Sequence, residues 1–330
     1  METRTLILNG AEVAGLLSLE DAIDAVSRAY MAYNAGKAVM PPIVSMDIPP
    51  HNGEMDFKAG YSSEEEIISM KIAGGYWDNP KNFGLSSCVA LICLFDGRNG
   101  LPLCVMDGTL ITGFRTGAAG AVAARALARP DSRTAAILGT GGQARMQIRA
   151  LATQFPLREV RVWGIEGCEL YAAEMRTLLP GIRFTVCGDA QEAVSGSDIV
   201  VTATPSHEAL VQADWISPGT HINAVGCDTP GKQELDPAIF LRAKVVNDCI
   251  KECVTRGETQ HPIALGLLRP EDIHAEIGEI LLGRKPGRAS AEEITLYDTT
   301  GLSILDIHTA ALVYRKACAQ GVGVRIPIMG

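Results

Sequence analysis

The chain has 330 residues, of which 47% are hydrophobic and 20% charged, and this composition excludes an intrinsically disordered protein. Its 29 Lys and Arg against 38 Asp and Glu give a net charge of −9, so neither nucleic acid nor an anionic membrane is an expected partner. No run approaches the roughly 18 apolar residues of a membrane span, and the first residues lack a signal-peptide layout, so we expect a cytoplasmic protein. Nine scattered cysteines without a CxxC pair favour reduced thiols, and we expect no metal site.

The N-terminal part of the chain predicts a helix followed by an antiparallel sheet. Apolar residues recur at helical spacing over residues 18–35, Ser18 and Asp21 form an S-x-x-D cap, and Gly36 is a suitable end. Turn residues then bound short apolar runs, which we expect to be strands, at 67–73, 88–95 and 101–106. The segment Asp96-Gly-Arg-Asn-Gly100 has the composition of a hairpin loop.

The pattern changes after a helix of small residues at 116–128, which ends before Pro130 and allows close approach of another backbone. Apolar runs alternate from there with helical segments, which predicts an α/β fold with a doubly wound parallel sheet. The expected strands lie near 134–138, 160–163, 183–186, 198–203, 221–225 and 244–247. A last amphipathic helix covers 303–319. We expect a dinucleotide-binding domain at 130–302 and a second domain at 1–129, joined by residues 303–330.

A glycine-rich turn follows the first strand of the expected parallel sheet. Gly139-x-Gly141-x-x-Ala144 stands between a strand and a helix, which is the context that the dinucleotide fingerprint requires. Gly139 permits a tight turn, Gly141 lets the backbone approach a pyrophosphate, and Ala144 keeps helix and strand close. The alternative is an ordinary βα turn.

The end of the next strand bears on the choice between NAD and NADP. An acidic residue there binds the ribose of NAD, whereas a base accommodates the 2′-phosphate of NADP. Neither type stands at Gly164 or Ile165, and Glu166 lies slightly late. NAD is therefore the expected cofactor, with NADP as the alternative.

Four charged residues are candidates for acting on a substrate. Lys58 and Lys71 interrupt apolar stretches, so each lies either on a wet strand face or in a buried site with an anionic partner. Arg115 directly precedes the small-residue helix, where it can hold a carboxylate or simply lie on the surface. Asp228 follows a strand and Gly226 at the expected ligand edge of the sheet, as a general acid/base or a turn residue.

Several longer motifs resemble the ornithine cyclodeaminase/mu-crystallin family almost from end to end. The matching stretches are ITGFRTGAAGAVAARALA (111–128), LGTGGQARMQIRAL (138–151), AVGCDTPGKQELDP (224–237) and ITLYDTTGLSILDIHTAALVYRKA (294–317). FKAGY (57–61), KIAGGYW (71–77) and GETQHPIALGLL (257–268) resemble iminosuccinate reductases in particular, and other stretches resemble cyclodeaminase-like proteins associated with ectoine breakdown.

The resemblance implies roles for individual residues. It places the carboxylate-binding Lys and Arg on Lys71 and Arg115, the catalytic Asp on Asp228 and an extra substrate-binding Lys on Lys58. Lys71 is also expected among the catalytic groups, and Arg115 among those that contact the cofactor. The remaining expected cofactor contacts are Thr116, Gly139, Thr140, Gly141, Gly142, Gln143, Ala144, Trp163, Gly164, Thr202, Ala203, Thr204, Val225, Gly226, Lys232 and Ser303.

Two positions depart from the family pattern. Typical cyclodeaminases carry Arg after Met-Pro-Pro, and this chain has Ile43, which removes a carboxylate anchor and disfavours ornithine. His308 replaces a residue that is usually small.

The resemblance implies an NAD(P)H-dependent imino-acid reductase, such as one that reduces iminosuccinate to L-aspartate. The alternatives are a cyclodeaminase, a cyclic ketimine reductase acting on pyrroline-2-carboxylate, and a non-catalytic binding protein like mu-crystallin. The expected partner is a small imino or amino acid, and the resemblance implies a homodimer through the N-terminal sheet.

Overall fold

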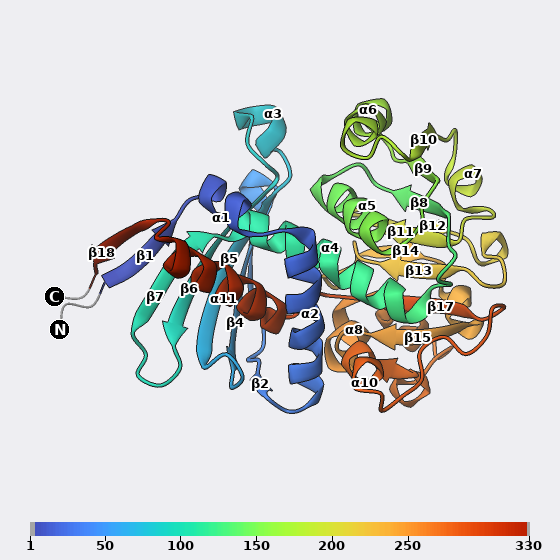
Figure 1. The fold of residues 1–330 in the computed structure, drawn as a ribbon. Coiled ribbons are helices and arrows are strands. Elements are labelled where there is room, and N and C mark those ends of the chain that lie inside the picture. The colour runs from blue at the N-terminus through green and yellow to red at the C-terminus, as the bar shows by residue number, and fades with distance from the viewer. Residues whose placement is uncertain (1–3, 329–330) are drawn as a thin grey trace. The chain divides into compact units, whose positions relative to one another are not determined.

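The computed structural model describes residues 4–328 and divides into two compact units (Figure 1). Unit 1 comprises Met1–Arg115 and Leu302–Gly330, and unit 2 comprises Thr116–Gly301. Among the described residues, no helix is long and apolar enough to cross a membrane.

Unit 1 is built on one mixed sheet with the strand order β18-β1-β7-β6-β5-β4-β2, with β3 also paired to β4. All pairs are antiparallel except the parallel pair of β1 and β7. The strands are β1 (Arg4–Leu8), β2 (Ala38–Val39), β3 (Val44–Ile48), β4 (Gly53–Ser62), β5 (Ile67–Tyr76), β6 (Cys88–Asp96), β7 (Pro102–Asp107) and β18 (Val324–Pro327). The predicted hairpin loop joins β6 to β7, and Gly100 in it has φ +75°.

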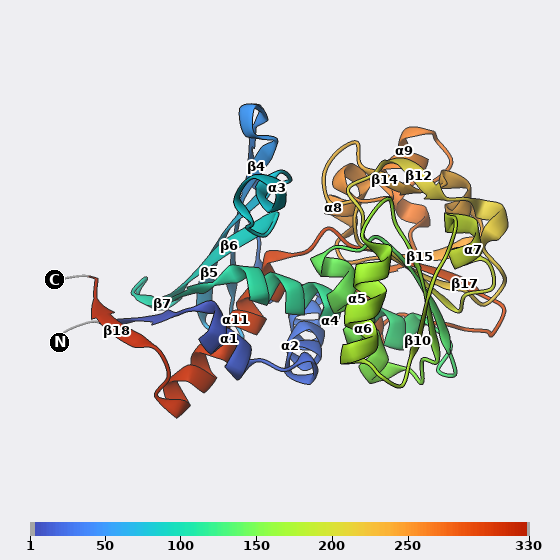
Figure 2. The ribbon, with the colours of Figure 1, turned by 90° about the horizontal axis from the view of Figure 1, so that it is seen from above.

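Helices cover one face of this sheet, as Figure 2 shows for α1 (Gly10–Leu16), α2 (Leu19–Asn34) and α11 (Ser303–Gln320). α11 packs on β4 and β5 and against α2. The predicted cap of α2 is present, because Asp21 N donates to Ser18 Oγ at 3.1 Å and Ser18 N donates to Asp21 Oδ2 at 3.2 Å. A short helix, α3 (Asn79–Phe83), lies between β5 and β6.

Helix α4 (Gly108–Leu127) begins earlier than the sequence predicted, so Arg115 lies inside a helix rather than before one. Leu110 N donates to Asp107 Oδ1 at 2.8 Å, and this cap starts the helix despite Gly108 and Thr109. The division between the units falls within α4, whereas we expected a boundary after residue 129. Residues from Thr116 onward pack with unit 2. The packing is close at Gly117, because an added Cβ there would lie 2.7 Å from Met146 O of the next helix along the chain.

Unit 2 contains the predicted doubly wound parallel sheet, with the strand order β10-β9-β8-β11-β13-β17-β15-β16. The strands are β8 (Thr134–Leu138), β9 (Glu159–Trp163), β10 (Arg183–Val186), β11 (Ile199–Thr202), β13 (His221–Ala224), β15 (Ala243–Asn247), β16 (Ala275–Glu276) and β17 (Ile294–Asp298). β17 was not predicted from the sequence, although it lies between β13 and β15. A separate parallel pair joins β12 (His207–Val211) to β14 (Gln233–Leu235).

Helices lie on both faces of the sheet of unit 2, as the side chains of β8 show. Ala135 and Ile137 enter a core cluster with α5 (Gly142–Gln154) and α6 (Cys168–Leu178). Ala136 and Leu138 point the other way, into a cluster with α7 (Ala190–Val194). The remaining helices of this unit are α8 (Ile250–Arg256), α9 (Gln260–Ala264) and α10 (Ile277–Leu281).

Candidate functional site

Unit 1 contains a buried cluster of three cations around one carboxylate. Lys71 Nζ lies 2.8 Å from Asp306 Oδ2, and Arg115 Nε donates to Asp306 Oδ1 at 3.2 Å. The exposed fractions are 1% for Lys71, 6% for Arg115 and 6% for Lys58, and Asp306 is fully buried. The structure therefore places all three predicted substrate-binding residues in the interior, and it excludes the wet-face and surface interpretations that the sequence left open.

The strand register explains how Lys58 and Lys71 come together. They are directly opposite each other on the antiparallel strands β4 and β5, so both side chains point to the same face of the sheet. This is the face on which α11 packs, and α11 carries Asp306. Arg115 reaches the same carboxylate from α4.

Burial and neighbouring charges shift the pKa of two members of this cluster. Desolvation, together with the charge of Arg115, lowers the pKa of Lys71 to about 7, although Asp306 opposes the shift. Burial by itself would raise the pKa of Asp306, but the charges of Lys71 and Arg115 hold it below its usual range. The cluster therefore contains one firmly ionised carboxylate and a lysine that titrates near neutral pH.

Asp306 was not among the functional residues predicted from the sequence. Its signal was present in the motif TGLSILD, where it is the last residue, but nothing local indicated that it is buried beside two cations. Ser303, at the start of the same helix, is also in unit 1, and its buried Oγ has no hydrogen-bond partner among the described residues.

The glycine loop of unit 2 lies between β8 and α5, as predicted. Gly139 has φ +110°, and a Cβ there would lie 2.5 Å from Ala203 O. At Gly141 and Gly142, in contrast, an added Cβ meets no atom of residues 4–328 within 4 Å. Within the same part of the chain, no side-chain hydrogen bond caps the N-terminus of α5 at Gly141. The open space above uncapped backbone N–H groups fits a pyrophosphate, so the loop can hold a dinucleotide.

Backbone hydrogen bonds bring the other expected cofactor residues of unit 2 to the same edge of the sheet. Gly139 N donates to Trp163 O at 2.8 Å, and Val225 N donates to Thr202 O at 3.0 Å. The residues at the carboxyl ends of β9, β8, β11 and β13 are therefore neighbours, which is where doubly wound folds bind ligands. They are Trp163, Gly164, Gly139, Thr140, Thr202, Ala203, Thr204, Val225 and Gly226.

Three further expected contacts lie on helices of unit 2. Gln143 and Ala144 are in the first turn of α5, and Ala144 is fully buried, in keeping with close packing of helix and strand. Thr116 is in α4, and its buried Oγ1 has no hydrogen-bond partner among the described residues. The ribose of the cofactor was expected at the segment that follows β9. In this segment Ile165 is 95% exposed, and the neighbouring Glu166 is exposed as well.

Asp228 and Lys232 occupy the loop that follows β13 in unit 2. Lys232 Nζ lies 2.8 Å from Asp228 Oδ1, which also accepts a hydrogen bond from Thr229 Oγ1 at 3.1 Å. The Asp228 side chain is 45% exposed, whereas that of Lys232 is 11% exposed. Asp228 is thus an accessible carboxylate held in place at the ligand edge, as a general acid/base requires.

Cys227, Glu258 and His261 place three metal-type ligand atoms within 4.8 Å of one another. Both oxygens of Glu258 accept backbone N–H groups, from Glu234 and Leu235. His261 Nε2 lies 2.6 Å from Lys232 O, and because a carbonyl oxygen only accepts, this nitrogen carries the proton. These hydrogen bonds give the cluster a structural use, and they leave Nε2 of His261 unsuited to ligation.

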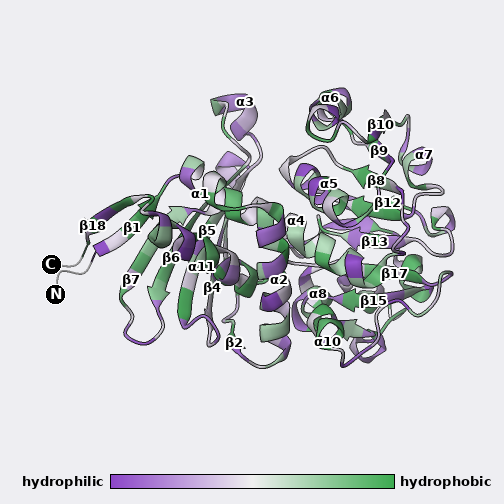
Figure 3. Cartoon of the chain, in the orientation of Figure 1, coloured by the Kyte–Doolittle hydropathy of each residue, from purple (hydrophilic) through white to green (hydrophobic). Residues whose placement is uncertain are grey.

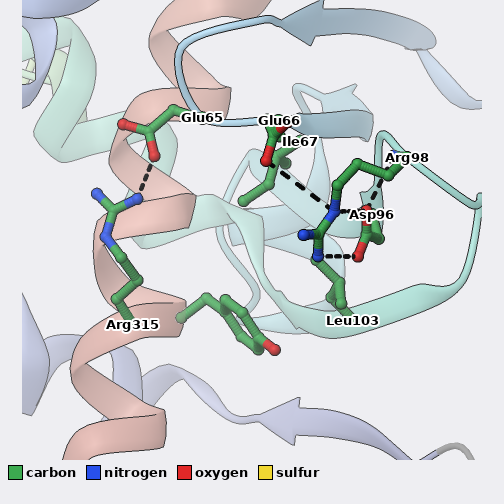
Figure 4. Close-up of a pocket in the computed structure, with 8 residues that line it drawn as sticks. Glu65, Glu66, Ile67, Asp96, Arg98, Leu103 and Arg315 are labelled. Carbon is green, nitrogen blue, oxygen red and sulfur yellow. Dashed lines mark hydrogen bonds and ion pairs between the residues drawn. The ribbon is translucent and has the colours of Figure 1, made fainter.

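A pocket of about 260 Å³, in which five of the eight lining residues are charged, opens in unit 1 (Figure 4). Its charged groups pair with one another, since Arg98 Nη2 donates to Asp96 Oδ2 at 2.7 Å and Arg315 pairs with Glu65. The atypical His308 lies behind Glu65, with Nδ1 3.7 Å from Glu65 Oε1, and burial lowers its pKa. None of the predicted site residues lines this pocket.

Comparison with known proteins gives three closely similar solved structures. The Δ1-pyrroline-2-carboxylate reductase of Thermococcus litoralis, in complex with NADH and L-proline, is 37% identical with a TM-score of 0.94, covering 98% of this chain and 100% of that chain. An archaeal alanine dehydrogenase dimer with bound NAD is 39% identical with a TM-score of 0.92, covering 99% and 100%. The iminosuccinate reductase of Paracoccus denitrificans, in complex with NAD+, is 31% identical with a TM-score of 0.91, covering 99% and 100%.

These relatives are all oxidoreductases of imino or amino acids, and the expectation of NAD agrees with the cofactors bound to them. The sequence profile of the ornithine cyclodeaminase/mu-crystallin family matches residues 3–321. The prediction of the family is confirmed over nearly the whole chain, and with it the predicted fold class. The chain belongs to the ornithine cyclodeaminase/mu-crystallin family.

Proposed function

We propose that the protein uses NADH to reduce a small α-imino acid to the amino acid. Lys71 and Arg115 bind the α-carboxylate, and Asp228 supplies a proton to the imine nitrogen. Bound NADH supplies the hydride that the α-carbon accepts. A protonated imine accepts hydride more readily, and general acid catalysis of this kind contributes on the order of 10²–10⁴-fold in rate. The glycine loop and the neighbouring strand ends of unit 2 hold the dinucleotide.

The observation that carries this proposal is the gathering of three buried cationic side chains at one place in unit 1. Lys71 Nζ lies 2.8 Å and Arg115 Nε 3.2 Å from the Asp306 carboxylate, and the charge of Lys58 also acts on that carboxylate. Burying charged side chains is costly, so such an arrangement persists where it serves to bind an anion. Fold stability alone favours apolar side chains at these strand positions.

The same cluster is suited to a substrate with two carboxylates. Lys71 and Arg115 bind the α-carboxylate, and Lys58, directly opposite Lys71 in the sheet, holds the second carboxylate. We therefore propose iminosuccinate as the substrate and L-aspartate as the product, in line with the iminosuccinate reductase among the relatives.

Two other reactions remain as alternatives. The relative that was solved with L-proline suggests reduction of a cyclic ketimine such as pyrroline-2-carboxylate. A cyclodeaminase would oxidise a diamino acid and reduce the ring imine again, with no net change in NADH. A non-catalytic binding protein, the alternative of another class, has no use for the accessible Asp228 beside Lys232.

An NADH-oxidation screen tests the proposal directly. The purified protein is given ammonium with oxaloacetate, pyruvate or glyoxylate, and separately a proline-ring imine, each with NADH and with NADPH. Fastest turnover with oxaloacetate and NADH supports iminosuccinate, whereas fastest turnover with the ring imine favours the ketimine reductase. Product formation without NADH consumption from a diamino acid identifies a cyclodeaminase. No binding of either dinucleotide by calorimetry would refute all three reactions.

We also propose that the protein is a homodimer through the sheet face of unit 1 opposite to Lys58 and Lys71, here called the outer face. Along each strand, residues of the outer face alternate with the buried residues of the face that carries Lys58 and Lys71. Figure 3 shows hydrophobic colouring along β5, β6 and β7. Exposed apolar patches of this kind mark interfaces, and the archaeal alanine dehydrogenase relative is a dimer. The exposed large apolar residues of the outer face are Val44, Met46, Ile68, Met70, Val89 and Leu91.

A further inference from the structure

Three buried carboxylates of unit 2, Asp298, Glu258 and Glu234, are connected to one another through backbone N–H groups. The carboxylates of Asp298 and Glu258 each accept the backbone N–H of the next residue in the series. Glu258 N donates to Asp298 Oδ1 at 3.1 Å, and Glu234 N donates to Glu258 Oε1 at 2.5 Å. Asp298 ends β17, an interior strand of the parallel sheet, whereas Glu234 lies on β14 of the separate two-stranded pair. We refer to these three residues as the carboxylate relay.

The last member, Glu234, holds two loops together. Its Oε1 accepts hydrogen bonds from Thr204 N at 2.6 Å and from Thr204 Oγ1 at 2.7 Å. Its Oε2 accepts Gly226 N at 2.9 Å. Thr204 follows β11, and Gly226 follows β13 and begins the loop that contains Asp228 and Lys232. A Cβ at Gly226 would lie 2.6 Å from Glu234 Oε1, so only glycine allows this approach.

A second contact of the relay holds the other end of the same loop. Glu258 Oε2 accepts a hydrogen bond from Leu235 N at 3.2 Å, and Leu235 lies three residues after Lys232 in the chain. His261, three residues beyond Glu258, donates from Nε2 to Lys232 O at 2.6 Å. The segment between Gly226 and Leu235, which contains the partly exposed Asp228, is thus fixed at both ends by relay residues.

We infer that the carboxylate relay positions Asp228 and the end of β11 for the reaction, with Glu234 as the residue that sets the loop. This inference rests on the proposed function of Asp228 as the proton donor. Glu234 acts through the backbone of Gly226 and Thr204 and is therefore a positioning residue rather than a catalytic one. In its ionised form it provides charge-assisted hydrogen bonds, which are shorter and stronger than neutral ones.

The composition of the relay argues for a role beyond filling the core. Among the described residues, none of its three members forms an ion pair with Lys, Arg or His. Three adjacent buried carboxyl groups without a cation are unfavourable, because desolvation and mutual repulsion both oppose their ionisation. Apolar side chains would fill this space with less free-energy cost, but they could not fix the loop backbone.

The groups around the relay make it sensitive to pH. Thr202, Thr204 and Cys227 surround Glu234, Cys227 and His261 lie beside Glu258, and Asn247, Asp248, Cys253 and Thr259 lie around Asp298. Burial raises the pKa of Glu234 to about 6 and that of Asp298 to about 7. Burial and the charges of its two relay neighbours raise the pKa of Glu258 as well. As the pH falls through about 6, Glu234 takes up a proton, and its hold on Thr204 and Gly226 weakens.

The substitution Glu234→Gln tests the inference, with Glu208→Gln as the matched control on the paired strand β12. Hydrogen exchange of the Thr204 and Gly226 amides should accelerate about tenfold or more in E234Q, and E208Q should leave it unchanged. In turnover, E234Q should lower kcat on the order of 10- to 100-fold and remove the acidic limb of the kcat–pH profile near pH 6. An unchanged pH profile and kcat in a folded but less stable E234Q would show a structural role only and overturn the inference.

The wild-type protein provides a test that needs no variant and no turnover. After correction for the intrinsic pH dependence of exchange, the Thr204 and Gly226 amides should exchange faster below about pH 6 than above it. Unchanged exchange across this range would overturn the inference even if E234Q did not fold. A protein that turns over no imino acid yet shows this pH-dependent exchange would refute the proposed function and leave the relay intact.

Discussion

Lys58 and Lys71 lie directly opposite each other on adjacent antiparallel strands, and both are buried. Like charges at such a pair destabilise a sheet, and burial increases the effect. The arrangement is tolerated in part because Asp306 lies 2.8 Å from Lys71 Nζ. Arg115 shares the same carboxylate, and we regard this gathering of three buried cationic side chains as a site that a substrate anion completes.

Replacing Asp306 by Asn should strongly destabilise the protein. The change leaves Lys71 and Arg115 buried without their shared counter-charge, and breaking a buried ion pair in this way costs about 3–5 kcal/mol. Because the folded-state pKa of Asp306 is lowered, its contribution is present at neutral pH and is lost as the pH falls through that lowered value. Urea unfolding at pH 7 measures the loss of unfolding free energy.

The pair Lys37–Glu64 provides the control, since its N–O distance is 2.7 Å but both side chains are substantially exposed. Glu64→Gln should change the unfolding free energy by less than about 1 kcal/mol. Equal effects of D306N and E64Q would contradict the importance of the buried cluster.

Binding of carboxylate anions should weaken as the pH rises above about 7, the lowered pKa of Lys71. Loss of the proton removes one of the charges that the anion needs, so the affinity should fall about tenfold for each further pH unit. Titration of succinate, which has no amine of its own, by calorimetry at pH 6 to 9 measures this dependence. Lys71→Met should bind succinate weakly at every pH, whereas the exposed Lys81→Met should behave like the wild type.

The same lysine should affect stability in the opposite direction. Its folded-state pKa is lowered from the ordinary 10.5 to about 7, so between these values the unfolded chain binds more protons than the native protein. Stability from this group therefore rises with pH across that window and is constant below it. In K71M the slope of unfolding free energy against pH between 7 and 10 should decrease; an unchanged slope would show that Lys71 is not the titrating group.

The sequence was most informative where the signal was local. The cap at Ser18, the glycine turn at Gly139 and the strand rhythm after Pro130 are short-range patterns, and the structure contains each of them. The early start of α4 was missed, because Gly108 and Thr109 disfavour a helix; its support comes from the Asp107 cap and from the tertiary burial of Ile111 and Phe114.

The buried partners were the least predictable part of the candidate site. Asp306 pairs with residues far away in the chain, and Glu234 acts on backbone groups of two other loops. Both residues stood within motifs that carried the family resemblance, yet a carboxylate in a motif does not reveal what it contacts. Only the fold brings those groups together.

Two alanine substitutions in the glycine loop should have different consequences. Gly139→Ala places a Cβ 2.5 Å from Ala203 O at φ +110°, so it should cost about 1–3 kcal/mol of stability and impair NADH binding. Gly141 has φ −78° and open space at its Cβ position, so Gly141→Ala should unfold like the wild type. It should still weaken NADH binding about tenfold or more, which is about 1.4 kcal/mol. Thermal unfolding and NADH fluorescence titration separate the two effects; wild-type NADH affinity in G141A would refute a pyrophosphate at this loop.

Charges placed on the outer face of unit 1 should dissociate the proposed homodimer. Met70 and Leu91 are 41% and 43% exposed and point to the same side of adjacent strands, where the register sets Met70 beside Cys93 and Leu91 beside Ile72. The double variant Met70→Glu, Leu91→Glu would bury two carboxylates in an apolar interface, which is strongly unfavourable. Sedimentation equilibrium should then give the 35.1 kDa mass of one chain, compared with twice that mass for the wild type.

Ile165→Glu is the control, because Ile165 is 95% exposed in unit 2 and its replacement should leave the dimer intact. A dimer that survives the double variant would place the interface elsewhere on the chain, and the apolar outer face would then need another explanation.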